Sequence, residues 1–259
     1  MPTSVPLQAA FPSDSTIRSF SQMQSGPDIF IELFTSQDLL AQPWLSELTK
    51  MINASYLVGH TDRIKYLDNK LRLGSDSDLS SELGVSGFTA VAFARDQAGE
   101  KAEVIGTASM KPWKNDELWL RGEREIGGED GNKNEDRIQD EIDGEQADTA
   151  TAKHVLLESI CPGDYELAVV ALPPDNRYRG KGIAGRLVKA CEDELLRRRS
   201  QEGDQSQLIR VMIRVLKENA GVYWLKQGFK VVGSQRRPAG FWDALEPFTL
   251  WAMVRELRT

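Results

Sequence analysis

The chain has 259 residues, of which 40% are hydrophobic and 27% are charged. These fractions are those of ordinary globular proteins and exclude a fibrous or a wholly disordered chain. The formal net charge of -7 is local, because residues 121–148 hold eleven acidic and four basic residues while the rest of the chain holds 28 of each. This balance argues against a nucleic-acid-binding surface spread over the protein, and we expect no nucleic-acid partner.

Cysteines and histidines are few, and we predict no metal site. Cys161, Cys191, His60 and His154 match no zinc spacing. Both cysteines lie near apolar stretches, which favours buried thiols over a disulfide. We find no signal peptide and no apolar run of about 18 residues, so we expect a cytoplasmic protein without a membrane partner, with a nuclear location as the alternative.

The first half of the chain predicts a flexible start followed by strands and a helix. Residues 1–26 are rich in Ser, Pro, Gln and Gly without periodicity, as in a flexible tail. Apolar residues at helical spacing predict a helix over 39–56, and the Ser-, Asp- and Gly-rich stretch 72–86 predicts a loop. Runs of β-forming residues predict strands at 28–34, 88–94 and 104–110, the last two joined as a hairpin.

Residues 115–151 are acidic, Gly-rich and nearly free of large apolar side chains. Such a segment cannot bury enough surface to fold alone, so we predict a disordered insertion within one domain that spans 27–259. A solvated loop is the plainer interpretation, and a charged lid or docking segment is the alternative.

The second half alternates strands and helices. Residues 165–172 (YELAVVAL) predict a strand that ends at Pro173 and Pro174, which extend neither a strand nor a helix. Apolar residues near a 3.6-residue period predict a helix over 182–199, with three arginines in its last turn. The remaining predicted elements are strands at 207–216, 229–233 and 247–257 and a short helix at 218–226.

The turn between the 165–172 strand and the 182–199 helix reads RYRGKGIAG over residues 177–185. Glycine lets a ligand approach the backbone closely, and the first amides of a helix have no partners within it, so this turn suits an anion. Four cations accompany it, which a neutral ligand would not require: Arg177, Arg179, Lys181 and Arg186. A pyrophosphate fits both features.

Two other phosphate-binding motifs fit less well. The glycine spacing matches the dinucleotide fingerprint, which normally stands early in an alternating parallel fold and has an acid about twenty residues further on, at the end of a second strand. In this chain the glycines stand late, and the acids at that distance, Glu194 and Glu202, fall within or just beyond the predicted helix. A Walker phosphate loop is excluded because no Gly-Lys-Ser or Gly-Lys-Thr follows the glycines.

The glycine turn resembles motif A of the GNAT superfamily of N-acetyltransferases through Arg177, Gly180 and Gly182. A second block, NAGVYWLKQGF at 219–229, resembles motif B, a short helix that ends in Gly-Phe. The resemblance covers residues 30–257 in order, with the acidic insertion interrupting it. It implies a mixed α/β (α+β) domain with a central sheet of six to seven mostly antiparallel strands and helices on both faces.

The resemblance also implies acetyl-CoA as the cosubstrate. Its pantetheine arm would pair as an added strand where the 165–172 strand splays from the 207–216 strand, with its pyrophosphate on the amides of the glycine turn. The residues implied in cofactor binding are Val169, Val170, Ala171, Leu172, Arg177, Tyr178, Arg179, Gly180, Lys181, Gly182, Ile183, Ala184, Asn219 and Tyr223.

Glu166 is the candidate general base. Its placement before the glycine turn is similar to that of the catalytic glutamate in histone acetyltransferases of the superfamily, and burial would suit its carboxylate to take a proton from an ammonium. Strand alternation predicts that it shares a face with Ala168 and Val170. A salt-bridged structural glutamate is the alternative, and His154 and Glu158, which precede the strand, are poorer candidates.

The candidate general acid departs from the superfamily's pattern. Many relatives have a tyrosine five residues before the closing Phe of motif B, which can protonate the departing thiolate, whereas this chain has Trp224 there. Either Tyr223 takes the role with a shifted helix, or no tyrosine does.

These features together predict an enzyme that transfers an acetyl group to a primary amine of a small molecule or a protein lysine, as a monomer or homodimer. A neutral amine would attack the thioester directly, with backbone N–H groups of the central strand stabilising the oxyanion. The alternatives are a non-catalytic module that binds acetyl-CoA and an acyltransferase that uses a longer acyl-CoA.

Overall fold

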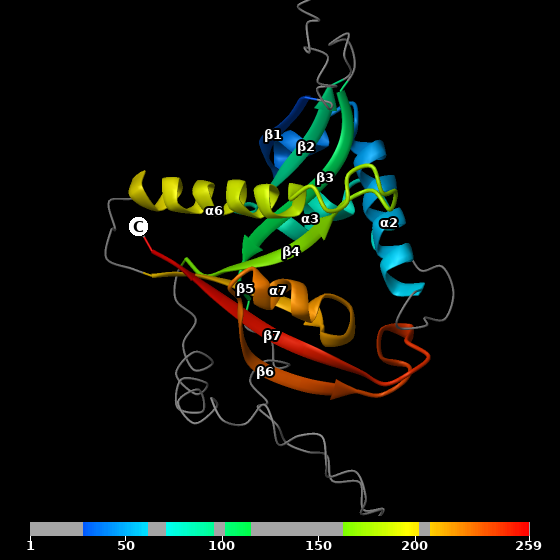
Figure 1. Cartoon of the computed structure of the whole chain (residues 1–259). Coiled ribbons are helices and arrows are strands. Elements are labelled where there is room, and N and C mark those ends of the chain that lie inside the picture. The colour runs from blue at the N-terminus through cyan, green and yellow to red at the C-terminus, as the bar shows by residue number, and fades with distance from the viewer. Residues whose placement is uncertain (1–27, 62–70, 96–101, 115–162, 202–207, 259) are drawn as a thin grey trace, which may run out of the picture.

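The computed structural model describes residues 28–61, 71–95, 102–114, 163–201 and 208–258 (Figure 1). The predicted tail at 1–26 and the predicted insertion at 115–151 lie outside these ranges. The same is true of His154, Glu158 and Cys161.

Seven strands form one sheet in the order β1-β2-β3-β4-β5-β7-β6 (Figure 1). All neighbouring pairs are antiparallel except β4 and β5, which are parallel. The strands are β1 (Asp28–Thr35), β2 (Phe88–Arg95), β3 (Ala102–Pro112), β4 (Tyr165–Ala171), β5 (Ile209–Leu216), β6 (Lys230–Arg237) and β7 (Phe248–Leu257). The predicted mixed, mostly antiparallel sheet is therefore confirmed, as is the β2–β3 hairpin pairing.

The helices cover both faces of the sheet, as predicted. None of those in the described ranges is long and apolar enough to cross a membrane. They are α1 (Ser36–Leu40), α2 (Leu45–Thr61), α3 (Asp78–Leu83), α6 (Ile183–Gln201) and α7 (Val222–Lys226), with a π-helical turn η2 (Lys217–Gly221) and a 3₁₀ turn η3 (Phe241–Asp243).

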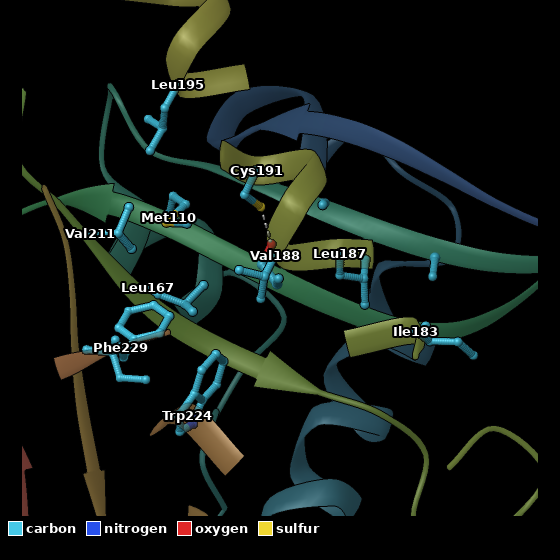
Figure 2. Packing of buried hydrophobic residues seen from close by; sticks show 14 of the residues in the cluster. Met110, Leu167, Ile183, Leu187, Val188, Cys191, Leu195, Val211, Trp224 and Phe229 are labelled. Atoms are coloured by element: carbon cyan, nitrogen blue, oxygen red, sulfur yellow. Dashed lines mark hydrogen bonds between the residues drawn. The ribbon is translucent and has the colours of Figure 1, made fainter. Parts of the chain in front are cut away.

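The α6 face of the sheet holds the larger core. One stripe of α6, including Ile183, Leu187 and Cys191, packs on the sheet beside Leu167 (Figure 2). A Cβ on Gly106 of β3 would lie 2.6 Å from the side chain of Leu172 and 3.0 Å from that of Leu187. Only glycine therefore leaves room at this point for α6 and the residue after β4 to pack closely on the sheet.

The opposite face is covered by α1, α2 and α3, and its core includes Leu48, Ile52, Leu79 and Leu83. Cys191, which lies in the described part of the chain, is a buried free thiol, as predicted.

Two details of the N-terminal half differ from the sequence-based expectation. The predicted 39–56 helix is two helices, and Pro43 stands in the turn between them, where it lacks the N–H that a continuous helix needs. The predicted loop 72–86 contains α3. The Asp78 carboxylate in its first turn accepts the Gly74 N–H at 2.8 Å, which orders the turn that leads into the helix. The apolar side of α3 then packs into the core.

Candidate active site

Among the described strands, the parallel β4–β5 pair is the one that separates early. It contains only Tyr165 opposite Val211 and Glu166 opposite Met212, although β4 continues to Ala171 and β5 to Leu216 (Figure 1). No strand in the described part of the chain therefore pairs with residues 167–171 of β4 on that side. Such an edge presents N–H and C=O groups to which an extended ligand can add as a strand.

A β-bulge interrupts β4 at the start of this unpaired edge. Ser109 of β3 lies opposite Val169 and Met110 lies opposite Leu167, so Ala168 is left without a partner. An extra residue reverses the alternation of side chains beyond it. Val170 consequently packs with the α6-side core, whereas Val169 and Ala171 join the core under α2 and α3.

The bulge corrects the prediction that Glu166, Ala168 and Val170 share one face. Ala168 packs against the α2/α3-side core and the Glu166 side chain lies near Lys111, whose ammonium contacts Glu82 of α3. Glu166 and Ala168 therefore face α2 and α3, while Val170 faces α6. Simple alternation failed because the pairing register was not readable from the sequence.

The glycine turn lies after the end of β4 and opens α6. Gly180 and Gly182 have φ angles of 72° and 73°, which residues other than glycine rarely adopt. A Cβ on either glycine would meet no atom within 4 Å. The Arg186 N–H donates to the Gly182 carbonyl at 3.0 Å and closes the first helical turn. The amides of residues 183–185 precede this bond and have no carbonyl one turn earlier in the helix to bind.

The side chains around the turn hold it to the sheet. Arg177 Nη2 lies 3.3 Å from Glu103 Oε1 and 3.2 Å from Asp175 Oδ2, and the buried Tyr178 donates its hydroxyl to Glu103 Oε2 at 3.0 Å. Burial, followed by the hydrogen bond to Glu103, raises the pKa of Tyr178. Arg177 and Tyr178 thus fasten the turn to β3 and leave its backbone exposed to a ligand.

The four predicted cations do not all point to the turn. Arg186 donates through Nη2 to the Ile29 carbonyl of β1 at 3.1 Å, and Arg177 is engaged by Glu103 and Asp175. Arg179 and Lys181 are exposed beside the glycines. The positive charge next to the turn therefore comes from Arg179, Lys181 and the helix start itself.

Glu166 is buried and belongs to an ion-pair network on the α2/α3 side of the sheet. Arg214 of β5 donates to Glu166 Oε1 from Nε at 3.1 Å and from Nη2 at 2.9 Å. Lys111 Nζ lies 3.5 Å from Glu166 Oε2 and donates to Glu82 Oε1 at 2.9 Å, and Arg72 Nη2 donates to Glu82 Oε2 at 2.6 Å. We call these five side chains, Arg72, Glu82, Lys111, Glu166 and Arg214, the Glu166 network.

A second ion pair lies at the base of the same two strands. Arg210 of β5 donates to both carboxylate oxygens of Asp164, from Nε at 2.9 Å and from Nη2 at 2.5 Å. Both side chains are almost fully buried. Two arginines of β5 therefore bind two acids of the β4 segment at the point where the strands still pair.

The motif B helix places its aromatic residues differently from the superfamily's pattern. Trp224 is buried in the α6-side core, with its ring centroid 5.3 Å from that of Phe229 (Figure 2). Tyr223 is 39% exposed, packs edge-on against Trp224, and has its pKa raised by burial. The inward position is thus occupied by Trp224, and Asn219 is exposed in the π-helical turn before it.

Tyr56 of α2 is a site residue that the sequence did not indicate. Burial raises its pKa, although the Arg72 guanidinium and the Val170 backbone both hydrogen-bond its hydroxyl and act in the opposite direction. Arg72 Cζ lies 5.8 Å from the centroid of its ring. Tyr56 therefore extends from α2 to the unpaired part of β4, a contact between segments more than a hundred residues apart.

The other members of the Glu166 network were also not predicted, although β5 carried a signal. Arg210 and Arg214 are four residues apart in the apolar strand IRVMIRVL and therefore point to the same face of the sheet. An unpaired charge in such a buried strand would be costly. A buried strand with two arginines on one face needs acids on the next strand, which Asp164 and Glu166 supply. Within the described ranges, no group of three or more His, Cys, Asp or Glu side chains is placed to hold a metal ion.

No protein-family model and no curated protein matches this chain. Its structure is similar to that of the PaiA N-acetyltransferase of Thermoplasma acidophilum in complex with coenzyme A, with 14% identity, a TM-score of 0.47, and coverage of 89% of this chain and 99% of that one. It is also similar to a GNAT family acetyltransferase of Streptococcus pneumoniae (14% identity, TM-score 0.49, coverage 89% and 100%) and to the polyamine N-acetyltransferase of Drosophila melanogaster (11% identity, TM-score 0.47, coverage 89% and 100%). At these identities the function has to be argued from the chain's own residues.

Proposed function

We propose that this chain is an N-acetyltransferase of the GNAT superfamily, which transfers an acetyl group from acetyl-CoA to a primary amine. The observation that carries the proposal is the unpaired edge of β4 lying in sequence directly before the glycine turn that opens α6. A long ligand with an amide-containing arm and a pyrophosphate matches these two features in order.

The residues present fit such a cosubstrate. Backbone groups of residues 169–172 are available to pair with the pantetheine arm, and the amides of residues 180–184 converge on the start of a 19-residue helix. The open space at Gly180 and Gly182 leaves room for phosphate oxygens. Acetyl-CoA supplies an activated acyl group as a thioester, and in this proposal the unpaired β4 amides would stabilise the oxyanion.

Glu166 is the proposed proton acceptor for the attacking amine. Its Oε1 is committed to Arg214, whereas Oε2 has the looser ion pair with Lys111 at 3.5 Å, so Oε2 is the atom that can take a proton directly or through water. Tyr223 is the proposed proton donor to the thiolate, because it is the tyrosine next to the inward Trp224 and its partly exposed hydroxyl is protonated at neutral pH.

A non-catalytic module that binds acetyl-CoA is the second candidate. Two observations favour it: both oxygens of Glu166 already face cations, and Trp224, which has no ionisable group, fills the inward position of motif B. An acyltransferase for longer acyl chains keeps the chemistry and changes only the donor.

The first test is calorimetric titration of coenzyme A into the wild type, Gly182→Trp and the control Gly84→Trp. Gly84 has a similar φ of 65° and the same open space, so the control shares the backbone strain but not the location at α6. Gly182→Trp should lose binding while Gly84→Trp keeps it. Binding of both variants within about threefold of wild type, about 0.7 kcal/mol, would remove the phosphate-site assignment.

The second test is release of free thiol from acetyl-CoA in the presence of a panel of amines. Amine-dependent release supports the transferase, and its slowing in Tyr223→Phe would support the proton donor. Tight binding of coenzyme A without amine-dependent release by any panel member would favour the binding module.

A further inference from the structure

Tyr56 is held at the unpaired edge of β4 by α2 and by the backbone at Leu73. Its side chain packs against the α2/α3-side core, of which Val169 of that edge is a member. One turn earlier on α2, Asn53 donates through Nδ2 to the Leu73 carbonyl at 2.9 Å and accepts the Leu73 N–H at 2.8 Å. These two bonds fix the neighbouring Arg72 beside Tyr56, with Cζ 5.8 Å from the ring centroid. The position of the Tyr56 side chain is therefore set from two segments of the chain.

The Tyr56 hydroxyl oxygen accepts a backbone N–H of the same edge. Burial raises the pKa of Tyr56, and hydrogen bonds with the Arg72 guanidinium and the Val170 backbone act against this rise. A hydrogen bond lowers the pKa of a tyrosine when it is donated to the phenol oxygen, so Val170 contributes its N–H. The hydroxyl itself is protonated at neutral pH, as that of an ordinary tyrosine is.

The Val170 N–H lies at the end of the edge where the acyl group would be. In the proposed complex the pyrophosphate is at residues 180–184 and the pantetheine arm lies along residues 169–172, so the arm runs toward lower residue numbers and carries its acyl group near Val170. Glu166, the proposed acceptor of the amine proton, is four residues earlier and faces α2 and α3, as Tyr56 does. The Tyr56 oxygen therefore lies where an acyl oxygen would accept the Val170 N–H.

We infer that Tyr56 is a catalytic residue of the proposed transfer, and that its hydroxyl and the Val170 N–H together bind the thioester oxygen and the negative charge that develops on it. The inference rests on the proposed acetyltransferase function and names the second donor of its oxyanion hole. When the thioester oxygen takes the Val170 N–H, the Tyr56 hydroxyl donates its hydrogen to the same oxygen.

The electrons and protons of this reaction balance without any further reactant. The amine nitrogen bonds to the acetyl carbon, and the carbonyl electron pair moves to the oxygen that both donors contact. The pair then returns, and the carbon–sulfur bond breaks with its electrons on sulfur. The proton lost by nitrogen goes to Glu166 or to water, and the thiolate takes a proton from Tyr223 or from solvent. Tyr56 keeps its own proton throughout.

A measurement that does not depend on turnover is the infrared carbonyl band of acetyl-CoA labelled with ¹³C at the thioester carbonyl and bound without amine. Donors directed at the oxygen weaken the C=O bond and lower the frequency of the band. The wild-type band should lie below that of the same compound in water, and Tyr56→Phe, which removes only the hydroxyl, should raise it. The control Tyr165→Phe removes a hydroxyl at the paired start of β4 and should keep the wild-type band.

Turnover gives the second readout. Tyr56→Phe should lower kcat by about a hundredfold, the scale for loss of one oxyanion-hole donor, with the KM of the amine unchanged. Tyr165→Phe should keep the wild-type kcat. The affinity for coenzyme A, which has no acyl oxygen, should be the same in all three proteins and reports whether the site is folded in each.

An unchanged carbonyl band in Tyr56→Phe, or a kcat within about threefold of wild type, would overturn the inference and leave the transferase function intact. A rise in the KM of the amine alone would also overturn it, because the hydroxyl would then act on the acceptor. A wild-type band at or above its position in water would do so without any variant. Absence of coenzyme A binding or of amine-dependent thiol release in the wild type would instead contradict the proposed function itself.

Discussion

Arg214 donates two hydrogen bonds to a single oxygen of Glu166, Oε1, from Nε at 3.1 Å and from Nη2 at 2.9 Å. The pair joins β5 to β4 at the last position where these strands are neighbours. Oε1 therefore helps to hold the two strands together, whereas Oε2 lies 3.5 Å from Lys111 Nζ. The arrangement allows Glu166 to be both a tie between strands and a proton acceptor.

Glu166→Gln should lower turnover by about a hundredfold near neutral pH, the usual scale for loss of a positioned general base. The amide keeps an oxygen for Arg214 and the side chain keeps its shape, so coenzyme A affinity should not change. The pH profile of kcat/KM should follow the fraction of amine that is already neutral in solution. Asp193→Asn, on the exposed side of α6, is the matched control. A variant with the wild-type rate and profile would make Glu166 purely structural.

Arg210→Met should lower the free energy of unfolding by about 3–5 kcal/mol, because it leaves the Asp164 carboxylate buried without its bidentate partner. The double variant Asp164→Leu/Arg210→Met should be less destabilised than the sum of the two single variants. Urea unfolding of all four proteins gives the interaction energy directly. Additive losses would mean that the two side chains stabilise the fold independently.

Glu82 should make the protein sensitive to acid. Burial alone would raise the pKa of Glu82, but the charges of Arg72 and Lys111 lower it below its ordinary value. The folded state then releases the proton more readily than the unfolded state, so the carboxylate stabilises the fold above pH of about 4.3 and this contribution is lost as the pH falls toward the folded pKa.

Urea midpoints of wild type and Glu82→Gln at pH 7 and pH 3 check this prediction. The variant should be less stable at pH 7 by about 1 kcal/mol, and the difference should shrink at pH 3. A difference that is independent of pH would mean that packing, and not charge, is what the substitution removes.

Cys191 should not react in the folded protein. Burial raises the pKa of its thiol to about 12, and the thiol lies 3.3 Å from the Ala108 carbonyl oxygen. In a Cys161→Ser background, a thiol reagent at pH 8 should modify Cys191 only after unfolding in urea, since the thiolate is the reactive form. Immediate stoichiometric modification of the native protein would contradict the burial of this residue.

Local pattern was enough to predict most elements. The run YELAVVAL followed by two prolines predicted β4, and the apolar period after Gly182 predicted α6, because a strand and an amphipathic helix differ in the spacing of their apolar residues. The positive φ angles of Gly180 and Gly182 agree with a turn that needs glycine. The sequence by itself thus determined the order of most elements and the place of the glycine turn.

Register and long-range contacts needed the tertiary structure. The bulge at Ala168 depends on how β3 pairs with β4, and no local signal in the strand marks it. α3 was missed because its Ser- and Asp-rich start resembles a loop, although the Asp78 side chain orders the turn before the helix by accepting the Gly74 N–H. The sequence showed Glu166 and Arg214 only as isolated charges 48 positions apart, and their contact follows from the parallel pairing of β4 with β5. Charge networks of this kind are decided by the tertiary fold, because Coulomb and hydrogen-bond energies depend on distance in space and not on separation along the chain.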